Sequence, residues 1–244
     1  QVLHAMRQLQ DSIGAHRKIN NLLMDASFLK AKRLNELQRK ALLHAKKLAQ
    51  QSDLLPELLM IAEREADFII ETQHVHLNKE YKAIAEEETA FLRHLNILVS
   101  LRQISNQLFI ALRTSTELKR EEQLHLVADA ESAAVIMEYK PGLSFACDYH
   151  YYRILAISNK LRGNKIEHMR LLQKMYQLYL NYPLQKELNA GGYKISLFNY
   201  MNACFSAGDL SQFPFLINEA KALPANNEDE EGENWQNVIH LELI

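Results

Sequence analysis

The sequence predicts an all-α protein, from the scarcity of two residue types and from the spacing of apolar residues. The 244 residues include seven Gly and five Pro, and neither type occurs between residues 57 and 140. Strands would need turn residues every 8 to 12 positions or so, and this stretch does not supply them. Apolar residues instead recur every three or four positions, which is helical spacing. We therefore expect antiparallel helix hairpins stacked in a row, with long helices in the middle.

The first half of the chain shows four predicted helical segments. Amphipathic helices are expected over residues 12–31 and 34–51, which read as a hairpin. Ser52 or Asp53 is expected to cap the next helix, because Pro56 then falls in its first turn, where the missing N–H costs nothing. Its apolar stripe runs from Leu55 to Ile70. Residues 79–113 follow as one long helix, or as two with a bend.

A new helix is expected at Thr114, because Thr114 and Glu117 have the spacing of a capping box. That helix runs to about residue 138 and is ended by Pro141-Gly142, the only Pro-Gly pair in the chain. Pro141-Gly142 is therefore the best candidate for a boundary between two regions of the chain. We expect an N-terminal helical region over residues 1–140 and a region of helical repeats over 141–244, continuous with the first.

The second region shows two hairpins of similar design. Helices are predicted over residues 144–161 and 166–182, and again over 188–207 and 211–223. Gly163-Asn164 and Gly208-Asp209 stop the first helix of each pair, and Pro183 and Pro224 end the second. An acidic link over 226–233 precedes another expected helix that contains Trp235. The absence of an initiator Met and the apolar ending HLELI suggest a piece cut from a longer polypeptide.

Residues 199–220, NYMNACFSAGDLSQFPFLINEA, resemble a tetratricopeptide repeat. Aromatic and small residues occupy the first helix, a Gly-Asp turn follows, and an Ala comes twelve residues later. Residues 152–175 repeat the turn, with Leu155 and Ala156 at the offsets of Tyr200 and Met201. The resemblance covers residues 144–244. It implies a right-handed α-α superhelix, in which the first helix of each hairpin lines a concave face that binds peptides or proteins.

Counting back from the two Gly turns places the inward positions that this resemblance implies. Arg153 and Phe198 lie ten residues before the turns, Ile157 and Asn202 six before, and Lys160 and Phe205 three before, with Asn199 adjacent. Cations and amides beside aromatic surface suit a peptide backbone or a carboxylate. The predicted partner-binding residues are Arg153, Lys160, Phe198, Asn199, Asn202 and Phe205. The many aromatic residues of this half also have a simpler interpretation, which is packing between stacked helices.

The charge distribution supplies an alternative function. Residues 1–50 carry ten Lys and Arg against three acids, whereas residues 51–100 carry ten acids against four cations. Two sequential helical regions of opposite charge are most simply neighbours that neutralise each other. The alternative is a regulatory nucleic-acid-binding protein that uses the basic N-terminal helices.

Enzyme chemistry finds little support in the sequence. Di-iron bundles use Glu-x-x-His on two helices, and this spacing occurs at Glu71/His74 and Glu122/His125, but both pairs lie on polar stripes rather than facing a core. No phosphate-binding loop or nucleophile elbow is present. We expect no catalytic residue, no cofactor and no metal ligand. A metal-dependent helical-bundle enzyme is the third alternative.

Cys147 and Cys204 lie far apart among apolar neighbours, which favours core packing in a reducing, cytoplasmic compartment over a disulfide. The sequence leaves open whether a signal peptide lies upstream of residue 1. No run of residues is long and apolar enough to span a membrane. The leading prediction is a non-enzymatic, protein- or peptide-binding scaffold that uses the concave face of its C-terminal repeats. A homodimer through the long middle helices is also left open.

Overall fold

The computed structural model describes residues 14–72, 77–114 and 120–223, and within these ranges the protein is all-helical, as predicted. The described ranges contain no strand. The helices are α2 (Ala15–Ala31), α3 (Asn35–Gln51), α4 (Leu55–Thr72), α5 (Leu77–Arg113), α6 (Arg120–Ser132), α7 (Ala134–Glu138), α8 (Phe145–Arg162), α9 (Lys165–Asn181), α10 (Pro183–Leu188), α11 (Ala190–Ala207) and α12 (Phe213–Lys221).

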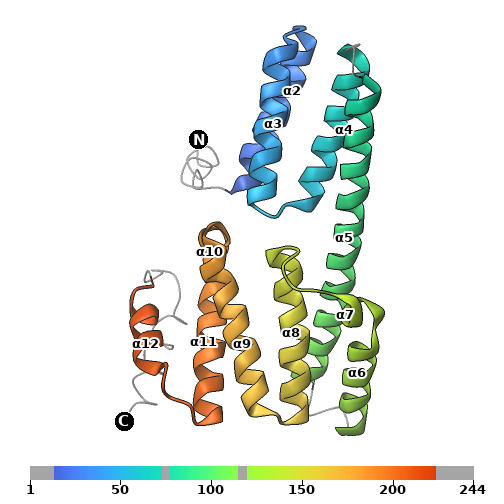
Figure 1. Cartoon of the computed structure of the whole chain (residues 1–244). Helices are drawn as coiled ribbons and strands as arrows, with labels where there is room; N and C mark the ends of the chain where they lie inside the picture. The colour runs from blue at the N-terminus through green and yellow to red at the C-terminus, as the bar shows by residue number, and fades with distance from the viewer. Residues whose placement is uncertain (1–13, 73–76, 115–119, 224–244) are drawn as a thin grey trace.

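The helices form two groups joined by the long helix α5, which runs the length of the molecule beside both (Figure 1). One group contains α2, α3 and α4, and the other contains α6 to α12. Each helix of the series α2, α3, α4, α5, α8, α9, α11 and α12 packs against the one before it. The first part of α5 packs against the first group through Ile84, Phe91 and Leu95, and its later part buries Leu101 and Leu108 against the second.

The core is divided into three clusters of buried side chains that follow this arrangement. One lies within α2, α3 and α4, and another lies within α8, α9, α11 and α12. The third contains Leu101 and Leu108 of α5 together with Cys147 and Ile154 of α8. Because this cluster joins residues on both sides of residue 140, the N-terminal and C-terminal regions share a core.

The predicted helix stops at Gly163 and Gly208 are correct, and both follow the same physical rule. Gly163 has φ of 81° and Gly208 has φ of 75°, the left-handed conformation that only Gly adopts without strain. The backbone N–H of the next residue then bonds back to the carbonyl of Asn159 in α8 and of Cys204 in α11, at 2.9 and 3.0 Å. This Schellman arrangement satisfies carbonyls that a helix end would otherwise leave unpaired.

Several predicted boundaries differ from the structure. Residues 79–113 belong to one unbroken helix, whereas the helix expected up to residue 138 is interrupted at Ala133, between α6 and α7. The helix expected over 188–207 is interrupted at Asn189, whose side chain caps α11 by accepting from the Gly192 N–H at 3.0 Å. Thr114 donates its hydroxyl to the Ile110 carbonyl, and the rest of its predicted capping box lies outside the described residues. The expected features beyond residue 224 lie outside them too.

The predicted capping of α4 by Ser52 or Asp53 is wrong. Ser52 ends α3, and its hydroxyl is buried without a partner in the described part of the chain. Asp53 has φ of 56°, and its carboxylate accepts a hydrogen bond from the Ala146 N–H, in the first turn of α8, at 2.9 Å. Gln185 of α10 donates to the Ser52 carbonyl at 2.7 Å. The α3–α4 turn therefore joins the two groups of helices.

The opposite charges of the first hundred residues lie side by side, as predicted. Lys30 of α2 pairs with Glu71 of α4 at 2.6 Å. Lys46 of α3 pairs with Glu65 of α4 at 2.7 Å and with Glu87 of α5 at 2.5 Å. Some of the positive charges of the α2–α3 hairpin are therefore paired with acids within the fold.

No described helix combines the length and the apolar composition that spanning a lipid bilayer requires.

The tyrosines of the C-terminal half mostly serve packing, which was the simpler of the two interpretations. Tyr176, Tyr179, Tyr193 and Tyr200 are buried in the cluster of α8 to α12. The Tyr176 ring stacks on those of Tyr193 and Tyr200, with centroids 5.9 Å apart in each pair. Such contacts add to the burial of the rings, so these side chains stabilise the stacking of α9 on α11.

Candidate partner-binding groove

A groove of about 640 Å³ lies on the face formed by the later part of α5 and by α8, α9 and α11. Its floor contains the buried side chains of Ala156, Ile157, Leu172 and Met175. Of the six predicted partner-binding residues, four line it: Arg153 and Lys160 on α8, and Asn199 and Asn202 on α11. Residues 46 positions apart in the sequence, Arg153 and Asn199, are thus brought to one surface.

Helical periodicity explains the α8 wall of the groove. Arg153, Ile157 and Lys160 follow one another at steps of four and three, so they share a face of α8. Ile154 and Leu161, one position further along, do not line the groove and are buried in the third core cluster, which also includes Ile157. The contact of α8 with α5 therefore sets its rotation, and that rotation presents the cations to the groove.

Arg153 is held in place by α5. Its guanidinium lies 4.4 Å from the ring centroid of Phe109 and donates to Oδ1 of Asn106 at 3.4 Å. Phe109 itself lines the groove. Stacking on an aromatic ring orients a guanidinium without neutralising it, so Arg153 presents a fixed positive charge and free N–H donors to a ligand.

The charges lining the groove are all of one sign. Arg153, Lys160 and Lys165 line it, and among the described residues no Asp or Glu does. Lys160 and Lys165 form no ion pair with any described residue. Unpaired cations beside an apolar floor form a surface that attracts a carboxylate and gains from burying an apolar side chain next to it.

His168 supplies a neutral polar group to the groove. Its Nδ1 lies 2.8 Å from the Ala156 carbonyl and donates to it. Burial lowers the pKa of His168 below its usual range, and Lys160 lowers it further, against the opposing effect of that hydrogen bond. The ring is therefore uncharged at neutral pH.

The α11 wall carries Asn199 and Asn202, whose side chains are exposed and make no hydrogen bond within the described ranges. A free amide both donates and accepts, so it matches the N–H and C=O of a peptide backbone. Ile195 and Ser206 lie on the same wall. Steps of four, three and four connect Ile195, Asn199, Asn202 and Ser206, which is one face of a helix.

The other two predicted positions, Phe198 and Phe205, do not line the groove. Phe198 packs against the core cluster of α8 to α12, and Phe205 is 54 % exposed. The prediction assumed that α8 and α11 have the same rotation relative to their Gly turns. The groove-lining positions of α11 are displaced by about one residue, and one residue turns a helix by about 100°.

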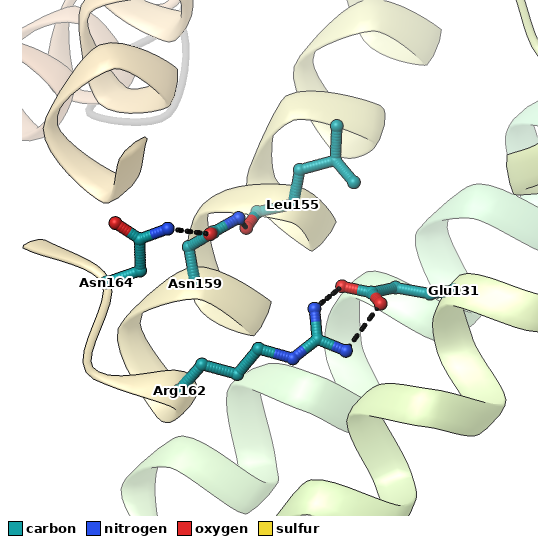
Figure 2. Close-up of polar contacts among 5 residues, drawn as sticks. All are labelled: Glu131, Leu155, Asn159, Arg162 and Asn164. Carbon is teal, nitrogen blue, oxygen red and sulfur yellow. Dashed lines mark hydrogen bonds and ion pairs between the residues drawn. The ribbon is translucent and has the colours of Figure 1, made fainter. Parts of the chain in front are cut away.

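Polar contacts fix the end of the groove where α8 turns into α9 (Figure 2). Arg162 makes two hydrogen bonds to Glu131 of α6, at 2.5 and 2.6 Å. Asn159 donates to the Leu155 carbonyl at 2.9 Å, and Asn164 donates to Asn159 Oδ1 at 3.2 Å. Lys160 and Lys165 flank this turn, so the contacts determine where the two cations lie.

Phe109, Lys165 and His168 also line the groove, and none of them is among the positions predicted from the sequence. Lys165 and His168 lie on the second helix of a hairpin, whereas the repeat resemblance directed attention to first helices. Phe109 belongs to α5, which has no counterpart in the repeat pattern. No local pattern in the sequence marks any of the three.

The residues considered for metal or thiol chemistry occupy other places. No group of three His, Cys, Asp or Glu suited to a metal ion occurs within the described residues. Glu71 pairs with Lys30, and His125 lies 3.0 Å from Asp129 at the surface, while His74 is outside the described ranges. Burial raises the pKa of the Cys147 thiol to about 11 and also raises that of Cys204, so both thiols stay protonated at neutral pH.

Comparisons with protein families, with curated proteins and with solved structures find no match to this chain. The function proposed below therefore depends on the geometry and charge of the groove.

Proposed function

We propose that the protein is a non-enzymatic scaffold whose helices stack as a tetratricopeptide-like α-α superhelix, and that its groove binds a peptide or a protein segment. The observation that carries the proposal is the lining of the groove, which in the described part of the chain has three cations, two free Asn amides and an apolar floor, with no acid. The consecutive packing of α8, α9, α11 and α12 supports the superhelical stacking.

Each part of the lining suits a feature of a peptide. Asn199 and Asn202 are three residues apart on one face of α11 and match backbone polar groups. Arg153, Lys160 and Lys165 favour a carboxylate from a side chain or a chain end. The floor around Ile157 and Leu172 accepts an apolar side chain, which contributes about 25 cal/mol for each Å² that it removes from water.

A peptide-display selection on the purified full-length chain tests this function. We expect peptides to be enriched, and their affinity, measured by fluorescence anisotropy, to fall more than about tenfold in the triple variant Arg153→Ala, Lys160→Ala, Asn202→Ala. Charged hydrogen bonds contribute about 1.5–3 kcal/mol each, and 1.4 kcal/mol is a factor of ten.

A matched control separates loss of binding from loss of fold. The variant Arg39→Ala, Lys40→Ala, Lys47→Ala removes three exposed cations of α3 that do not line the groove. It should bind the selected peptides like the original chain, and all three proteins should melt alike by circular dichroism. Peptides that bind the groove variant as tightly as the original chain would refute the proposal.

A further inference from the structure

The chain contains its own segment with the chemistry that the groove would attract. Residues 224–244, which follow the described part of the chain, carry six acids and no Lys or Arg. The whole chain has a net charge of −2 and this segment contributes −6, which leaves +4 on residues 1–223. Five of the acids fall within residues 228–233, and the apolar residues Trp235, Val238, Ile239 and Leu241 come directly after them.

We propose that residues 224–244 bind in the groove of their own chain, with the acids of 228–233 against Arg153, Lys160 and Lys165 and the apolar residues on the floor. The inference rests on the proposed function, because the segment then competes with an external peptide for the same surface. The groove is thereby autoinhibited, and a partner has to displace the segment before it binds.

The length of the segment is sufficient for this contact. The described chain ends at Leu223, directly after α12, and α12 packs against α11, which forms one wall of the groove. A helix with its side chains is about 10–12 Å across. Ten residues in extended conformation span about 33 Å, so the acidic run can pass around one helix and reach the groove.

Charge complementarity selects this occupant. The described residues that line the groove include three cations and no acid, so an acidic segment is attracted and a basic one is repelled. Because the segment is attached to the same chain, its effective concentration at the groove is in the millimolar range. A free ligand of similar affinity would need a similar concentration to compete with it. Weak contacts are therefore sufficient to keep the groove covered.

Trp235 is the only Trp of the chain, so its fluorescence reports the segment directly in the full-length protein. We would measure acrylamide quenching of Trp235 in the original chain and in the variant Arg153→Glu, Lys160→Glu, Lys165→Glu. If the segment occupies the groove, quenching should at least double in the variant and the emission should shift to the red. The matched variant Arg39→Glu, Lys40→Glu, Lys47→Glu makes the same charge change on α3 and should leave both unchanged.

A second variant keeps the groove intact and alters only the segment. Glu228→Gln, Asp229→Asn, Glu230→Gln and Glu231→Gln together remove four negative charges from the segment. Quenching of Trp235 should rise here as well, and a peptide selected on the groove should bind this variant about ten times more tightly than the original chain. This arm does not depend on the folding of a charge-reversed groove.

Three outcomes would overturn the inference. One is that Trp235 is quenched equally in the original chain, in the groove variant and in the segment variant. Another is that the α3 control variant raises the quenching of Trp235 as much as the groove variant does. The third is quenching that depends on protein concentration, which would place the segment in the groove of a second copy. If peptides bind the groove while Trp235 stays exposed in every variant, the inference fails and the proposed function stands. If no peptide binds even the segment variant, the proposed function fails.

Discussion

The buried ring of His150 predicts how the stability of the fold responds to acid. His150 lies on α8, and its Nδ1 is buried without a hydrogen-bond partner in the described part of the chain. Burial, together with the nearby positive charges of Arg153 and Arg102, lowers the pKa of His150 from 6.5 to about 4. The folded protein therefore holds this ring neutral at a pH where an unfolded chain protonates it.

The sign and size of the effect follow from this pKa difference. Below pH 6.5 the unfolded chain binds a proton that the folded chain does not bind until about pH 4, so the contribution of this ring falls as the pH drops through that window. One unit of pKa corresponds to 1.36 kcal/mol, and at a pH of about 4.5 the loss amounts to roughly 2.5 kcal/mol. Such a loss is a large fraction of the stability of an ordinary domain.

Urea unfolding of the original chain, of His150→Gln and of the exposed control His44→Gln measures this contribution. Between a pH of about 7 and one of about 4.5, His150→Gln should lose roughly 2.5 kcal/mol less than the original chain. His44→Gln should follow the original chain. Other buried histidines contribute equally to all three proteins and cancel in the comparison. Parallel curves for His150→Gln and the original chain would refute the reasoning.

Three further sets of substitutions test local features of the fold, each by urea unfolding at neutral pH. Asp53→Asn should leave the free energy of unfolding unchanged or slightly raised. Burial raises the pKa of the Asp53 carboxyl, and Asn keeps both the oxygen that accepts from the Ala146 N–H and the tolerance for positive φ. Asp53→Ala should instead cost about 1–2 kcal/mol. Gly208→Ala should cost about 1–2 kcal/mol through its left-handed backbone, while Gly191→Ala, in the first turn of α11 with open space around it, should cost nothing. A double-mutant cycle with Arg162→Ala and Glu131→Ala should give a coupling of about 0.2–1 kcal/mol, since the pair is partly exposed.

The features of the fold that could be predicted from the sequence are those set by local backbone chemistry. Gly163 and Gly208 end helices because a left-handed residue closes the last turn, and this requirement depends on the residue itself. Ser144 accepts a hydrogen bond from the Cys147 N–H at 3.3 Å and so begins α8 where the sequence placed it. The missing Gly and Pro of residues 57–140 likewise predicted that this stretch is nearly all helix, and its described part is helical except at Thr114, Ala133, Tyr139 and Lys140.

Features that depend on distant partners could not be predicted in this way. Asp53 was expected to cap the helix that follows it, but its carboxylate caps α8, 93 residues later, because the fold brings that N-terminus beside the α3–α4 turn. The rotation of α11 is also a tertiary property. Repeat spacing favoured Phe198 and Phe205 together with Asn199 and Asn202, whereas packing against α9 and α12 turns only the two Asn to the groove.

The placement of the positive charges favours the groove over the basic N-terminal helices as the binding surface. Lys46 already contacts Glu65 and Glu87, so a ligand that used it would first have to break two ion pairs. Lys160 and Lys165 have no such partner among the described residues, and a carboxylate reaches them at no comparable cost. Arg39, Lys40 and Lys47 of α3 likewise form no ion pair within the described ranges, but they do not line the groove with its apolar floor. If positive charge alone attracted the acidic segment, reversing the α3 cations would release Trp235 as effectively as reversing those of the groove. A response confined to the groove variant would mean that charge acts there together with the apolar surface beside it.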